Sequence, residues 1–152
     1  MSEEIENIFD PKNNHHIMSA HSGTDDSIYN MIVRKKQMFP TMYHFFSLGL
    51  VYGILHNKKS EKSKVGDIIY FSRISNEKIK DVINICYMIL NDGRKQSEII
   101  SEMMEYADGG IEALYEIYEK NGSFQLPMLI EDSKSIWSER VKKLHNINSE
   151  DS

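Results

Sequence analysis

Carboxylates at helical spacing are the residues of this chain best placed to do chemistry. Between Gln96 and Glu119 the sequence has seven acidic residues and no lysine or arginine. Paired carboxylates on one helix face can bind a divalent cation or act as general acid and base. Without a histidine among them they are more typical of a polar surface, and we predict an acidic face that docks a partner. Its residues are Glu98, Glu102, Glu105, Glu112, Glu116 and Glu119.

The opposite charge gathers earlier in the chain. From Arg34 to Lys64 there are seven basic residues and one acidic residue, in two groups that flank an apolar helix. Such groups could contact a phosphate backbone or an acidic partner, although a solvated helix end and loop is the simpler interpretation. The residues assigned to this contact are Arg34, Lys35, Lys36, Lys58, Lys59, Lys62 and Lys64.

The histidines and the single cysteine are weaker candidates for chemistry. The residues considered are five of the six histidines and the cysteine: His15, His16, His21, His44, His56 and Cys86. The first three lie in a polar segment and are interpreted as solvated, whereas the other two histidines belong to the apolar helix and are interpreted as core or rim. The cysteine lies in an apolar helical run, where it is typical of a small buried hydrophobe. We therefore predict no catalytic residue, no metal and no cofactor.

Nucleotide-binding and hydrolase motifs are absent from the sequence. It contains neither G-x-G-x-x-G nor G-x-x-x-x-G-K-[ST], and neither G-x-S-x-G nor H-E-x-x-H. These absences exclude only enzymes built on those patterns. A small metal-dependent enzyme that uses His44, His56 or the acidic residues therefore stays open as an alternative.

Apolar residues at helical spacing predict the elements that position these side chains. We expect an all-α, compact single-domain bundle of about six helices with at most one short strand pair. The helices start near residues 28, 42, 77, 97, 111 and 133. We expect residues 1–24 to form a mobile N-terminal arm, residues 25–145 the helical domain and residues 146–152 a disordered tail.

Glycines mark two features of this bundle. Gly49 and Gly53 lie four residues apart on the second helix, so one face lacks side chains and another helix can approach it closely. This helix is therefore expected to be the centre of the core. The sequence Asp108-Gly109-Gly110 is expected to break a helix and to create a helix-turn-helix shape. Glutamates on its second helix would repel DNA phosphates, which argues against DNA reading by that helix.

The N-terminal sequence and the apolar segments predict a cytoplasmic location. The first residues, Met1 to Glu4, are acidic and no long apolar stretch follows them, unlike a secretory signal. The longest apolar run, from Tyr43 to Leu55, is too short for a membrane span of about 20 residues. We expect no membrane contact.

The order of several segments resembles a known family. These segments are 39–43 with 49–53, the basic loop after them, Ile68-Ile69-Tyr70-Phe71, the run 79–90, and Glu105-Tyr106-Ala107-Asp108-Gly109-Gly110-Ile111-Glu112. Over residues 38–118 the chain is similar to the small accessory proteins encoded beside bacterial Dnd DNA phosphorothioation systems (dnd system-associated protein 4). The resemblance implies a setting of DNA modification or restriction and assembly with larger subunits, and it implies no catalytic residue.

These observations favour a function in binding rather than catalysis. The leading hypothesis is a non-catalytic accessory or adaptor subunit of a bacterial anti-phage defence or DNA-modification system that acts by protein–protein interaction. Its partner would be a larger protein subunit, with a homo-oligomer and weak DNA contact as further options. The alternatives are direct DNA binding through the basic residues between 34 and 64, and the small metal-dependent enzyme described above.

Overall fold

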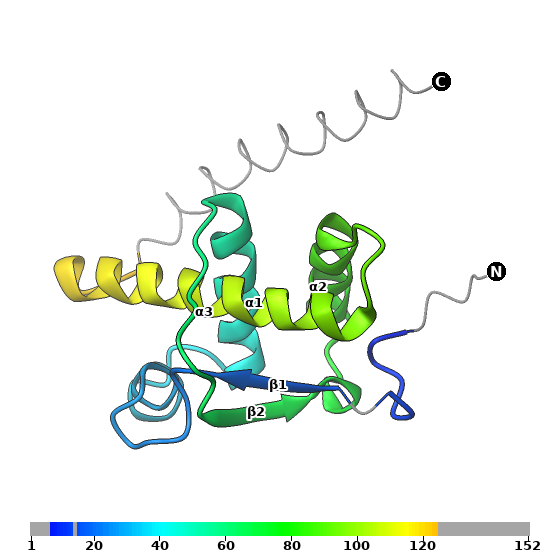
Figure 1. Ribbon diagram of the computed structural model, residues 1–152. Helices are drawn as coiled ribbons and strands as arrows, with labels where there is room; N and C mark the ends of the chain where they lie inside the picture. The colour runs from blue at the N-terminus through cyan, green and yellow to red at the C-terminus, as the bar shows by residue number, and fades with distance from the viewer. Residues whose placement is uncertain (1–6, 14, 125–152) are drawn as a thin grey trace. The chain divides into compact units, whose positions relative to one another are not determined.

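The computed structural model describes residues 7–13 and 15–124 of the chain (Figure 1). Its elements, in chain order, are β1 (His16–Ser19), a π-helical segment (Asn30–Lys35), α1 (Met42–Leu55), β2 (Gly66–Tyr70), a single 3-10 turn (Phe71–Arg73), α2 (Glu77–Leu90) and α3 (Gln96–Asn121). The chain divides into two compact units, Met1–Glu112 and Ala113–Ser152. The described part of the second unit holds the last residues of α3 and a short segment after it, where Phe124 packs against Tyr118 at 5.3 Å between ring centroids.

The mostly helical character predicted from the sequence is confirmed, but the described part of the chain has about four helices instead of six. The helices expected from residues 97 and 111 are one continuous helix, α3. Asp108-Gly109-Gly110 therefore makes no turn, and the helix-turn-helix shape is wrong. The helix expected from residue 133 lies outside the described residues. The helix expected from residue 28 is reduced to the π-helical segment, followed by Gln37 with a left-handed φ of 53°.

The glycine face of α1 explains why α3 is not broken. A Cβ atom added to Gly49 would lie 2.5 Å from Ile111 Cγ1, and one added to Gly110 would overlap the carbonyl oxygen of Gly49. The two helices thus cross with their backbones in contact (Figure 1). The close approach predicted from Gly49 and Gly53 is confirmed, and it explains why Gly110 sits inside a helix. Gly109 instead faces the loop after α1, where an added Cβ would overlap the carbonyl oxygen of Lys58.

The apolar residues of α1 make it the centre of the core, as predicted. Thr41 caps the helix, because its side chain accepts a hydrogen bond from the His44 amide. Phe45, Leu50 and Ile54 are fully buried. Among the described residues, no helix is both long enough and apolar enough to cross a membrane.

β1 and β2 form a two-stranded antiparallel sheet near the N-terminal end of α1 (Figure 1). This agrees with the expectation of at most one short strand pair. Residues 16–19, however, were expected in a mobile arm. Ile17 is fully buried opposite Ile69, and upstream of it Ile8 and Phe9 are also buried. A four-residue strand is too short to show its alternation in the sequence, which is why this part of the segment 1–24 differs from the expectation.

α2 begins after Asn76, whose side chain accepts a hydrogen bond from the Ile79 amide. It carries Cys86 on its buried face, as the sequence analysis predicted. Burial raises the pKa of the Cys86 thiol to about 12, so the thiol stays protonated at neutral pH. A protonated, buried thiol is a poor nucleophile.

Candidate functional site

Asp108 on α3 is the centre of a buried polar network. Its side chain is 1% exposed, and Ser19 Oγ donates a hydrogen bond of 2.5 Å to its Oδ1 atom. The Ala20 amide and Lys64 Nζ both lie 2.9 Å from Oδ2. One carboxylate therefore holds the end of β1 and the loop before β2 against α3.

Glu112, one helical turn further along α3, holds a second group of side chains. Its Oε2 atom lies 2.7 Å from His21 Nε2, 2.8 Å from Ser60 Oγ and 3.4 Å from Lys62 Nζ. Burial alone would raise the pKa of Glu112, but the hydrogen bonds from His21 and Ser60 outweigh burial and hold this pKa below its ordinary value. The carboxylate is therefore charged at neutral pH.

A third group of contacts on α3 is a cluster of ion pairs. Lys59 Nζ lies 3.2 Å from Glu102 and 3.5 Å from Glu105, and Arg94 also pairs with Glu102. Burial alone would raise the pKa of Glu102, but its hydrogen bonds from Arg94 and Lys59 keep it below the ordinary value. The Ser60 amide also donates to the Glu105 carbonyl at 3.0 Å, which fixes the loop backbone on the helix.

These contacts change the interpretation of the two charged segments. Lys59, Lys62 and Lys64 pair with carboxylates of α3, so three cations assigned to an external contact have a partner within the chain, although only the pair of Lys64 with Asp108 is largely buried. The acidic face is likewise partly covered by the loop. The basic loop and the acidic residues of α3 are therefore complementary to each other. Their opposite charges are the feature of the sequence from which this pairing could have been predicted.

The remaining charged candidates lie at the surface. Arg34, Lys35 and Lys36 are exposed and make no ion pair within residues 7–13 and 15–124. Lys58 is exposed as well. The other members of the acidic face are spread apart: Glu98 accepts from the Lys95 amide, and Glu116 and Glu119 are exposed in the second unit.

The histidines differ from their expected places. His15 Nε2 lies 2.6 Å from Gln96 Oε1, His16 stacks on Tyr70 at 4.3 Å, and His21 is held by Glu112. The interpretation of these three as solvated is therefore wrong, because β1 carries them onto the folded unit.

The structure does not bring the candidate catalytic groups together. His44 and His56 lie at opposite ends of α1, about 18 Å apart by the helical rise. In the part of the chain that the structure describes, no three His, Cys, Asp or Glu side chains are grouped so that they could hold a metal. Ser19 and Ser60 contact carboxylates but are 1% and 5% exposed, so neither hydroxyl is open to a substrate.

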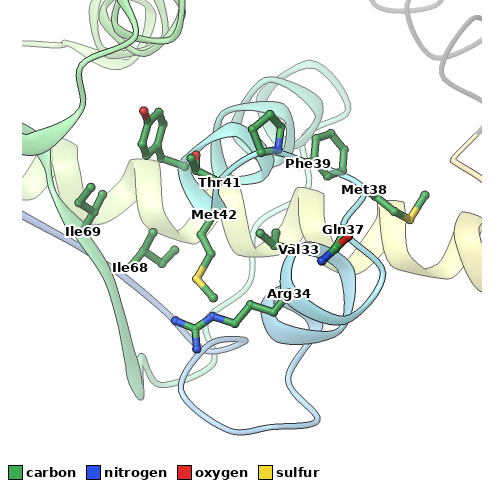
Figure 2. A pocket seen from close by; sticks show the side chains of 11 residues that line it. Val33, Arg34, Gln37, Met38, Phe39, Thr41, Met42, Ile68 and Ile69 are labelled. Carbon is green, nitrogen blue, oxygen red and sulfur yellow. The ribbon is translucent and has the colours of Figure 1, made fainter.

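An open, largely apolar groove is lined by residues that, apart from Arg34, the sequence analysis did not assign to a site. It has a volume of about 930 Å³ and runs between the π-helical segment, the start of α1 and β2 (Figure 2). Its lining is Val33, Arg34, Gln37, Met38, Phe39, Pro40, Thr41, Met42, Tyr43, Ile68 and Ile69.

A β-bulge shapes one wall of this groove. The register of β1 and β2 shifts between Ile17 and Met18, so that Ile68 is the extra residue on β2. Consecutive residues of a regular strand point to opposite faces, whereas a bulge redirects a side chain. Ile68 and Ile69 can therefore both line the groove, which a strict alternation would prevent.

The comparisons with known proteins identify no relative of this chain: no family model, no curated protein and no solved structure matches it. The function is therefore inferred from the geometry of the paired network and of the groove.

Lowering the pH should weaken the paired network because it protonates the carboxylates. A carboxyl with a lowered pKa in the folded state contributes stability above its unfolded pKa and loses it as the pH falls through the folded value. We expect the free energy of unfolding to decrease as the pH drops below about 4.3, the ordinary pKa of glutamate. The decrease should be less steep in Glu112→Gln. Urea unfolding at several pH values measures both slopes.

Glu61→Gln is the matched control for this measurement, since Glu61 is an exposed glutamate next to Ser60 in the loop between α1 and β2. Its pH profile should follow that of the wild type. An unchanged profile for Glu112→Gln would show that the contacts of Glu112 with His21 and Ser60 do not stabilise the fold.

Proposed function

We propose that this chain is a non-catalytic accessory subunit that binds a larger protein in a bacterial anti-phage defence or DNA-modification system. The observation that supports it is the contrast between the two surfaces. The charged residues of the loop and of α3 pair with each other, while the apolar groove stays open. The setting in defence or phosphorothioation rests on the resemblance of residues 38–118 to accessory proteins of Dnd systems.

Direct DNA binding is the second candidate, and one observation favours it. Arg34, Lys35 and Lys36 are exposed cations without an ion pair among the described residues. Binding to duplex DNA depends on cations that neutralise phosphates and release their counterions. Because Lys59, Lys62 and Lys64 also have carboxylate partners on α3, they are less available to phosphates than unpaired cations, and we rank this function below protein binding.

The adaptor function is tested in an extract of the cells that naturally express the chain. The tagged protein is isolated and its mass is measured by light scattering, for the wild type and for two variants. Met42→Glu places a charge in the groove, and Met88→Glu places the same charge on an exposed methionine of α2. We expect a complex with a larger subunit that is lost in Met42→Glu and kept in Met88→Glu.

Two results would count against this proposal. Recovery of the monomer alone would contradict the adaptor role. A purified chain that binds duplex DNA at low salt, with an affinity that falls steeply as salt is added, would favour the DNA-binding alternative instead.

A further inference from the structure

We propose that the groove binds a linear protein segment that combines acidic residues with apolar side chains. This inference rests on the proposed function, because it names the chemistry of the partner surface. Three features of the groove support it. They are the apolar lining, the positive charge at and next to the lining, and the stacking of the aromatic rings on neighbouring rings.

The lining of the groove suits apolar side chains. Met38 and Met42 contribute flexible thioether side chains from the loop before α1 and from its first turn, and β2 contributes Ile68, which appears near Met42 (Figure 2). Methionine adapts its shape to different apolar groups and is frequent at binding surfaces. Met38 is 38% exposed, so its thioether side chain is accessible to a partner.

The charge of the groove calls for an acidic occupant. Arg34 is part of the lining, with Lys35 and Lys36 next to it in sequence, and the lining contains no aspartate or glutamate. None of these three cations pairs with a carboxylate in the described part of the chain, unlike Lys59, Lys62 and Lys64 of the loop. A partner with carboxylates beside its apolar anchors would therefore complement this surface and associate faster at low salt.

The aromatic residues favour a peptide over single-stranded nucleic acid. Proteins that bind single strands stack bases on exposed aromatic rings along a row of cations. Phe39 is stacked on Phe45 at 5.1 Å, and Tyr43 is stacked on His44 at 5.1 Å. One face of each ring is thus covered, and Arg34 is the one cation in the lining. The experiment must therefore distinguish peptide binding from binding of single-stranded nucleic acid.

Selection from a display library of random linear peptides tests this inference on the full-length protein. The same library is applied to the wild type and to the double variant Arg34→Glu with Lys36→Glu, whose two residues are exposed. We expect the wild type to enrich peptides that carry both acidic and apolar residues. The double variant should instead enrich basic peptides, because Arg34 in the lining and Lys36, two residues from it in sequence, are both replaced by a negative charge.

The strongest wild-type peptide is then synthesised and its affinity is measured by fluorescence polarisation. The double variant, and separately Met42→Glu, should each weaken binding by about tenfold or more. The matched control is Arg73→Glu with Lys78→Glu, which reverses two exposed charges outside the lining and should leave the affinity unchanged. Circular dichroism confirms that each variant is folded.

Several outcomes would overturn the inference. They are enrichment of peptides without acidic residues, affinity that survives both groove variants, and displacement of the peptide by a single-stranded oligonucleotide. Failure here, together with a complex in the cell extract, would reject the acidic segment and keep the adaptor role. Groove-dependent peptide binding with only a monomer in the extract would reject the adaptor role instead.

Discussion

Replacing Gly110 with alanine is expected to destabilise the protein by about 3 kcal/mol or more, at the upper end of the cost of overpacking a core. The same change in an ordinary helix stabilises it by about 0.5–1 kcal/mol. Here the added Cβ would overlap the Gly49 carbonyl oxygen and lie 2.8 Å from the Gly53 amide nitrogen. Both are backbone atoms of α1, so no side-chain rotation can relieve the clash. Urea unfolding followed by circular dichroism measures the effect.

Ser101→Ala is the control for this prediction. Ser101 is exposed on the same helix, and its replacement should change the free energy of unfolding by less than about 0.5 kcal/mol. A neutral or stabilising effect of Gly110→Ala would show that α1 and α3 do not cross in backbone contact.

Asp108→Ala is expected to cost about 3–5 kcal/mol, the loss typical of removing one partner from a buried ion pair. It removes the acceptor of Ser19 Oγ and of the Ala20 amide, and it leaves Lys64, whose side chain is 19% exposed, without its carboxylate. Because Asp108 connects β1 to α3, the amide of Ala20 should also exchange with deuterium faster. Urea unfolding and hydrogen exchange measure the two effects.

Two variants separate this interpretation from a general loss of negative charge. Asp92→Ala removes an exposed carboxylate that pairs with Arg94, and it should change the free energy of unfolding far less than Asp108→Ala does. Adding Lys64→Met to Asp108→Ala should recover part of the loss, because no unpaired cation then remains. An Asp108→Ala protein as stable as the wild type would contradict a structural role for the network.

Features of the fold that depend on neighbouring residues could be predicted from the sequence. The start of α1 follows from Thr41 before an apolar run, and the start of α2 follows from Asn76. The spacing of Gly49 and Gly53 on one helix face predicts a close backbone approach, and the structure confirms it. In each case the signal lies within a few residues, where helical geometry is fixed.

Features of the fold that depend on residues distant in the chain could not be predicted from the sequence. Asp108-Gly109-Gly110 has the composition of a helix break, and only the backbone of α1 lying against Gly110 makes a continuous helix favourable. Ile17 forms a buried strand because residues 66–70 pair with it, and no period within four residues could indicate that.

The candidate site shows the same division. The sequence distinguishes a basic segment and an acidic segment, but it does not show that Lys59 reaches Glu102 or that Lys64 reaches Asp108. These partners are more than forty residues apart in the chain. The groove was missed for a different reason. Its lining comes from the π-helical segment, the start of α1 and β2, and the π-helical geometry and the β-bulge in β2 leave no periodic pattern in the sequence.

The functional account depends on the groove being the surface that meets a partner, while the paired charges hold the fold together. Of the exposed large apolar residues in the described part of the chain, Met38 lies in the groove, Val65 lies just before β2, and Ile85 and Met88 lie on α2. The α2 residues therefore provide a natural internal comparison for any experiment on the groove.

Site-specific photo-crosslinking in the cells that naturally express the chain tests this claim most directly. A photoreactive amino acid is placed at position 42 in the groove or at position 88 on α2. The account predicts a discrete protein adduct from position 42 that disappears when Arg34→Glu is added, and no equivalent adduct from position 88. An adduct from position 88 alone, or an adduct from position 42 that persists with Arg34→Glu, would contradict it.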